Sequence, residues 1–145
     1  MHTTELLNDC KKLLVFKNIG IKLLNKLKAT LADSPYSGFF KNISTTDQNE
    51  LLFSYLGQNF KIRIELYFNN EAIPNQAYLT TYRLPEQQLR NDEEIISYPF
   101  NLDYTVNYGF TIDDFAVNYI SDFHQKLKQH YSESHKPFPI RINDK

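Results

Sequence analysis

The chain has 145 residues, of which 41% are hydrophobic and 23% charged, and its formal net charge is -1. These values are typical of a globular protein and give no overall electrostatic attraction to nucleic acid or to an anionic membrane. A chain of this length suits one folded domain, so residues 1–145 are expected to form a single domain.

Cysteine content and hydropathy bear on location. Cys10 is the single cysteine, so no internal disulfide can form. The chain does not open with a basic segment followed by a long apolar run, and no apolar run is long enough to span a bilayer. The sequence therefore predicts a cytoplasmic protein with no membrane partner. Its abundance of Lys, Asn, Ile and Tyr fits a bacterial source.

The N-terminal region shows helical spacing on both sides of Gly20. The first apolar face consists of Leu6, Leu7, Cys10, Leu13 and Leu14, and the second of Ile21, Leu24, Leu27 and Leu31. A glycine inside a helix costs about 1 kcal/mol relative to alanine, so Gly20 predicts either a turn between two helices or a kink in one. Cys10, on the apolar face, is expected to be buried as a small hydrophobic residue.

The middle of the chain predicts a series of strands in hairpin order. A loop is expected over Tyr36–Asn49, with a short helix or strand near Phe39–Ile43 as the alternative. The expected strands are Glu50–Leu56, Phe60–Phe68, Gln76–Leu84 and Ile95–Phe100, with Leu102–Tyr108 as either a fifth strand or an irregular return. Gly57–Asn59 would form the first turn. Glu86–Glu94 predicts an exposed loop or a single helical turn, and Pro99 predicts an edge strand.

The strand Phe60–Phe68 has the strongest pattern in the chain. Its apolar residues alternate with residues suited to water, which predicts one face in the core and one facing solvent or a partner. The outer residues are Lys61, Arg63, Glu65 and Tyr67.

The C-terminal region predicts a long helix over Phe110–Tyr131. Thr111 is the expected N-cap, and Asp113 and Asp114 lie in the first turn, where the helix dipole favours negative charge. Residues 132–145 are expected to form an irregular tail. Together these elements predict an α+β fold, in which an antiparallel meander of four to five strands is packed by one or two N-terminal helices and a long C-terminal helix.

No catalytic, cofactor or metal site is predicted. The four histidines, His2, His124, His130 and His135, do not have zinc-ligand spacing and are expected on the surface or in the tail. The carboxylates of Asp113–Asp114 and Asp92–Glu94 could attract a divalent ion, but helix-start charge and loop solvation explain them more simply. No nucleophile elbow and no glycine-rich phosphate loop is present.

This absence favours a binding function. The first hypothesis is a non-enzymatic, bacterial protein-binding module, such as an immunity protein, antitoxin or specialised chaperone, that binds one partner through Lys61, Arg63, Glu65 and Tyr67. The alternatives are a small-ligand-binding protein or enzyme with a pocket between sheet and helices, and nucleic-acid binding through the Lys-rich N-terminal helix, which the net charge disfavours. A homodimer through an edge strand or the exposed hairpin face is a further option.

Overall fold

The structure of the protein is a computed structural model that describes residues 2–33, 35–67, 76–86, 91–134 and 138–141. Its elements in chain order are helix α1 (His2–Ala32), a 3-10 turn (Tyr36–Gly38), strands β1 (Phe40–Thr45), β2 (Leu51–Tyr55), β3 (Gln58–Glu65), β4 (Gln76–Leu84) and β5 (Glu93–Asn101), and helix α2 (Ile112–Ser134). Expectations for residues 68–75, 87–90, 135–137 and 142–145 lie outside the described residues.

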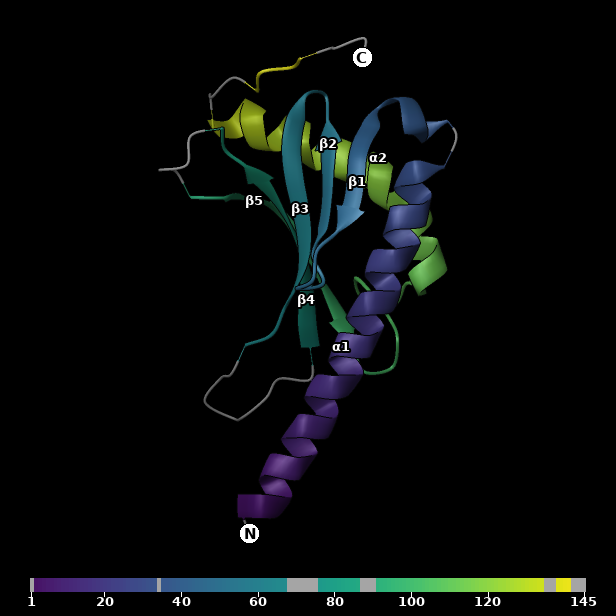
Figure 1. Ribbon diagram of the computed structural model, residues 1–145, viewed down its shortest axis with the longest axis vertical. Coiled ribbons are helices and arrows are strands. Elements are labelled where there is room, and N and C mark those ends of the chain that lie inside the picture. Colours follow the sequence, from purple (N-terminus) through teal and green to yellow (C-terminus); the bar gives the residue numbers. More distant parts are fainter. Residues whose placement is uncertain (1, 34, 68–75, 87–90, 135–137, 142–145) are drawn as a thin grey trace.

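The strands form one antiparallel sheet in the order β1-β2-β3-β4-β5, with β3 at its centre. Helix α2 crosses behind the sheet, and α1 runs alongside it and extends well past its end (Figure 1). The predicted α+β fold with an antiparallel meander is therefore confirmed. The sheet has five strands because β1 joins those that the sequence predicts most clearly.

A two-residue turn joins β2 to β3. Tyr55 pairs with Gln58, and both turn residues, Leu56 and Gly57, have positive φ, at 53° and 82°. Positive φ at both positions matches the right-handed twist of the flanking strands. The predicted turn at 57–59 is therefore too long, since β3 already begins at Gln58.

The apolar face of β3 lies at the centre of the core. Phe60 and Ile62 are fully buried, as their alternation predicts. The Phe60 ring stacks on Phe53 of β2, with centroids 5.5 Å apart, and meets Phe123 of α2 edge-on at 5.1 Å. Such ring pairs add stabilisation beyond the burial of their area, and here they join the sheet to α2.

Helix α1 is one continuous helix, so of the two alternatives predicted at Gly20 the turn between two helices is not found. Gly20 is buried against β3, and a Cβ built there would lie 2.6 Å from Cγ1 of Ile64. The glycine therefore serves close packing rather than a change of direction. It lets the axis of α1 approach the sheet where the two elements cross.

Two segments differ from their expected structure. The region expected to be a loop over Tyr36–Asn49 contains β1, so the alternative of a strand near Phe39–Ile43 is the correct one. Asn42 has a φ of 56° and breaks the alternation of β1. Glu93 and Glu94, expected in a loop, belong to β5.

The edge of the sheet beyond β5 is covered by an irregular return. Pro99 lies in this edge strand, as predicted. Val106 bridges to Phe100, and the Asn107 amide donates to the Pro99 carbonyl at 2.7 Å. Residues 102–108 therefore form the irregular return that the sequence left as an alternative.

Helix α2 begins as predicted. The Thr111 hydroxyl accepts a hydrogen bond from the Asp114 amide at 3.1 Å, which is an N-cap contact. Its apolar face is buried: Phe115, Ala116, Tyr119, Ile120, Phe123, Leu127 and Tyr131. The helix continues through Ser134, so the predicted irregular tail begins later than residue 132.

The last described residues pack over the β2–β3 turn. Phe138 contacts the Tyr131 ring at a centroid distance of 5.0 Å. The Gln58 side chain donates to the Pro139 carbonyl at 2.6 Å, and the Arg141 amide donates to the Leu56 carbonyl at 2.8 Å. This end of the core is thereby closed by the chain itself.

The contact of Gly20 with Ile64 gives a testable coupling. In the natural background, Gly20→Ala introduces a methyl that overlaps Ile64, and we expect a loss of stability. In an Ile64→Ala background the same change should stabilise by about 1 kcal/mol, because alanine is the better helix former. Urea denaturation of the four chains should give a coupling energy of about 1–3 kcal/mol. Equal effects in both backgrounds would contradict this packing.

Candidate functional site

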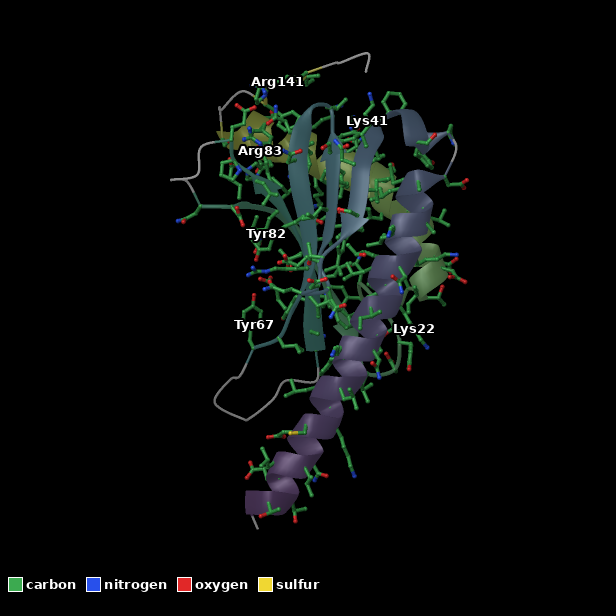
Figure 2. All side chains as sticks on the ribbon, viewed as in Figure 1. Lys22, Lys41, Tyr67, Tyr82, Arg83 and Arg141 are labelled. Atoms are coloured by element: carbon green, nitrogen blue, oxygen red, sulfur yellow. The ribbon has the colours of Figure 1, made fainter. Side chains whose placement is uncertain are left out.

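The structure brings together the four residues assigned to partner binding: Lys61, Arg63, Glu65 and Tyr67. They lie along the outer side of β3 and just beyond its end. Figure 2 shows Tyr67 and Tyr82 projecting from the same side of the sheet. The Tyr67 ring lies beside that of Tyr78 on β4, with centroids 5.9 Å apart. This outer face is thus both aromatic and charged.

Glu65 lies at the centre of this face. The sequence predicts that it is exposed, but only 8% of it is accessible, so it is buried. Its Oε2 atom accepts hydrogen bonds from Arg63 Nε at 3.1 Å, Arg63 Nη2 at 2.9 Å and the Tyr82 hydroxyl at 2.5 Å. Burial acts to raise the pKa of Glu65, but hydrogen bonds from Thr80, Tyr82, Arg63 and Tyr67 outweigh it and hold the pKa below its ordinary value.

Lys61 is also largely covered. Its Nζ lies 2.8 Å from Asp92 Oδ2 and 4.0 Å from Glu50 Oε2, and it sits 5.8 Å from the centroid of the Tyr82 ring. Arg63 stacks on the same ring at 4.9 Å. Arg63 and Tyr67 are therefore the predicted residues whose side chains a partner can reach most directly.

The electrostatics of this face suit recognition better than proton transfer. Burial and the hydrogen bond to Glu65 raise the pKa of Tyr82 to about 12. Glu65 is held ionised and Tyr82 protonated through the neutral range, whereas an efficient general acid or base titrates near its working pH. The side chains are instead held in fixed positions by one another.

A groove of about 640 Å³ separates α1 from the end of β3. It is lined by Leu13, Lys17, Gln48, Asn49, Glu50, Arg63, Ile64, Glu65, Leu66 and Tyr67. We call it the α1–β3 groove. Three of the four predicted residues line it, and Lys61 does not. The groove opens where α1 leaves the sheet, just before the crossing at Gly20.

The sheet itself ends unevenly beside this groove. Strand β2 begins at Leu51, which pairs with Ile62. Residues 63–65 of β3 extend past that point and pair with β4 on their other side. The groove therefore has the end of β3 as one wall and α1 as the other.

The N-terminal part of α1 projects beyond the sheet (Figure 1). Phe16 is the first buried residue of the helix among those whose side chains the structure describes. Leu6 is 62% exposed and Leu14 57%, and Leu7 and Cys10 are exposed as well. The expectations that this apolar face packs on the sheet and that Cys10 is buried are therefore wrong.

The helix in fact has two apolar faces. We call Leu6, Leu7, Cys10, Leu13 and Leu14 the leucine stripe. At 100° per residue, the stripe is centred about 135° around the helix from the buried face of Phe16, Ile19, Leu23 and Leu27, and Leu6 and Leu13 are its members nearest to that face. Sequence reasoning expected the apolar residues on both sides of Gly20 to pack on the sheet. The rotation between the two faces was the available signal that a separate surface begins at the N-terminus.

Two of the histidines have partners in the structure. His124 Nδ1 lies 2.6 Å from the Tyr55 hydroxyl, whose pKa is raised by burial, and His130 Nε2 lies 3.3 Å from Glu93. Both are half-buried between α2 and the sheet rather than free on the surface as expected. The side chain of His2 and all of His135 lie outside the described residues.

Two smaller hollows border α2, one beside β5 and one beside β1. One of about 310 Å³ is bordered by Tyr98 and Asp122, whose side chains share a short hydrogen bond from the tyrosine hydroxyl to the carboxylate. Burial and this bond raise the pKa of Tyr98. Another, of about 290 Å³, is bordered by Tyr55 and His124. Tyr98 thus remains a protonated donor to Asp122, and the Tyr55 hydroxyl is held against His124 Nδ1.

The acidic pairs are engaged with basic residues. Asp113 lies 3.5 Å from Lys26, Asp92 pairs with Lys61, and Glu93 lies 3.2 Å from Arg83. Within the described part of the chain, no group of three or more His, Cys, Asp or Glu side chains is arranged to hold a metal ion. Neither described helix is both long and apolar enough to cross a bilayer.

Comparison with known proteins adds no relative: no family model matches this chain, and searches of curated proteins and of solved structures gave no significant match.

The Glu65 network gives a pH-dependent prediction. The Glu65→Gln variant should lose about 2 kcal/mol of unfolding free energy at neutral pH, because a charged acceptor of buried hydrogen bonds is removed. The folded-state pKa of Glu65 lies below the ordinary 4.5, so this contribution is fully present above that value and disappears as pH falls through the lowered pKa.

Urea denaturation between pH 7 and pH 3 should therefore show the two chains converging in acid. The matched control is Glu94→Gln, which changes an exposed carboxylate on the same face. It should alter stability little at any of these pH values. A constant difference between natural chain and Glu65→Gln across the range would contradict the assigned network.

Proposed function

We propose that this chain is a non-enzymatic protein-binding module of bacterial type that holds one partner protein at the α1–β3 groove. The observation that carries the proposal is the leucine stripe, exposed on a helix that projects beside this groove. Contiguous exposed apolar surface on a folded chain marks an interaction site. Immunity proteins, antitoxins and specialised chaperones all act by holding one partner in this way.

The groove supports the proposal by its composition. Tyrosine and arginine dominate the binding energy of protein interfaces, and Tyr67 and Arg63 line the groove opposite Leu13. Arg63 is held by Glu65 and Tyr82, so little side-chain entropy would be lost when a partner binds it.

The alternative of a ligand pocket between sheet and helices receives less support. That space is filled by the stacked rings of Phe53 and Phe60 and by Phe123, which meets both of them edge-on. The hollow beside Tyr98 lies outside this core, and its volume of about 310 Å³ is at the small end for ligand pockets.

Nucleic-acid binding through α1 also receives less support. Its lysines, at positions 11, 12, 17, 22, 26 and 28, point to several sides of the helix rather than forming one stripe. Lys22 already lies over the Tyr104 ring and Lys26 beside Asp113. A nucleic-acid surface would instead require unengaged cations on one face.

The test compares two exposed side chains. Tyr67→Ala removes a groove wall, and Val117→Ala removes an exposed apolar side chain from α2, away from the groove. With tagged chains and extracts of the cells that encode the protein, a partner should be retained by the natural chain and by Val117→Ala. Tyr67→Ala should bind it at least about ten-fold more weakly.

Thermal unfolding should show all three chains folded at the temperature of the binding assay, with a somewhat lower midpoint for Tyr67→Ala, because this variant loses a hydrogen bond to Glu65 and a ring contact with Tyr78. The proposal fails if no protein is retained specifically by the natural chain. It also fails if Tyr67→Ala retains the partner as well as Val117→Ala does.

A further inference from the structure

We infer that the partner presents an amphipathic α-helix with acidic side chains, which packs along the leucine stripe of α1 and enters the α1–β3 groove. This inference rests on the proposed function and specifies the chemistry of its partner. It follows from the spacing, the charge and the position of the exposed part of α1.

The spacing favours a helical occupant. Leu6, Leu13, Gly20 and Leu27 follow one another every seven residues, and so do Leu7, Leu14 and Ile21. Seven-residue repeats of apolar side chains form the contact face of packed helices. Gly20 and Leu27 already use this face inside the fold, whereas Leu6 and Leu13 continue it past the end of the sheet.

The charge favours an acidic occupant. Lys17 makes no ion pair with any described residue, lies about 20° around the helix from the centre of the stripe and lines the groove, whereas Lys11 and Lys12 lie about 100° and 160° from that centre. The carboxylates of this segment, Glu5 and Asp9, lie about 100° or more around the helix from the centre of the stripe. The surface to be covered is therefore leucine with unpaired positive charge, and carboxylates complement it.

The same charge distribution disfavours a second copy of the chain as the occupant. Pairing two stripes would bring Lys17 against leucines or against another lysine-bearing segment. Glu5 and Asp9 could not reach it, because they lie on another side of the helix. An added β-strand is disfavoured by length, since only residues 63–65 of β3 extend past β2.

The position of the groove defines where the partner helix would end. One side of that helix would lie on Leu6, Leu7 and Leu14. Its end would reach Lys17 and the wall formed by Tyr67. Gly20 and Ile64 close the groove beyond that point, because α1 and β3 are in contact there. A helix of about two to four turns would cover the stripe at 5.4 Å per turn.

Cys10 provides the experiment, because it is the single cysteine of the chain and lies exposed within the stripe. The full chain carrying a maleimide benzophenone on Cys10 would be irradiated in an extract of the cells that encode it. The cross-linked peptide would then be sequenced by mass spectrometry. We expect a peptide from another protein, with apolar residues three and four apart and a net negative charge.

A second chain, Val117→Cys in a Cys10→Ser background, carries the same label on α2 as a matched control. It should not capture that peptide. The charge is tested with Lys17→Glu, which should weaken binding roughly ten-fold or more at low salt, and with Lys126→Glu on α2, which should leave binding unchanged. Replacing the partner's carboxylates by lysine should restore its binding to Lys17→Glu.

Six outcomes would overturn the inference, and the last of them would overturn the proposed function as well. Three of them concern the cross-link from Cys10: it forms to a second copy of the chain that also sediments as a dimer, to a basic or non-helical peptide, or to phosphatidylglycerol vesicles with no protein captured. The fourth is a loss of binding in Lys126→Glu equal to that in Lys17→Glu. Capture of a partner only by the label on α2 would overturn the inference while leaving a protein-binding function intact. Absence of specific capture by either label would overturn both.

Discussion

The close approach of α1 to β3 at Gly20 is the constraint on which the rest of the structure depends. Without a side chain at this position, the helix can lie directly on Ile64. The contact fixes where the helix crosses the sheet, and it therefore fixes how much of α1 is left beyond the crossing. The buried half of the helix and the exposed half are two consequences of one contact. The groove exists because the helix leaves the sheet at an angle from this point.

The parts of the fold that depend on local pattern could be predicted from the sequence. The burial of Phe60 and Ile62 on β3 and the cap of α2 at Thr111 are set by neighbouring residues, and both are found as predicted. Strand β1 could not be predicted with the same clarity, because Asn42 adopts a positive φ and its strand shifts register there. The exposure of Leu6 and Leu14 depends on where the sheet ends, which is a long-range property.

In the candidate site, too, local pattern predicts some features, whereas others depend on contacts between distant residues. Alternation placed Arg63 and Tyr67 on the outer face, and both are accessible there. It could not predict that Glu65 would be covered, because that depends on Tyr82 of the neighbouring strand and on the way Arg63 turns toward Glu65 along its own strand. Charged residues on a sheet face are usually taken as solvent contacts. Here they form a network whose members hold one another, and this network gives the groove a rigid wall.

The projecting half of α1 has a consequence for its own persistence. A helical segment of this length that has no buried side chain among the described residues is only marginally stable in water, because its few hydrogen bonds barely offset the ordering of its backbone. Amide hydrogens before Phe16 should therefore exchange with solvent far faster than those behind it, where side chains are buried. The part of α1 before Phe16 is thus less stable against local unfolding than the part after it. Any molecule that covers the first half would also slow its exchange, so that association and helix formation become a single event.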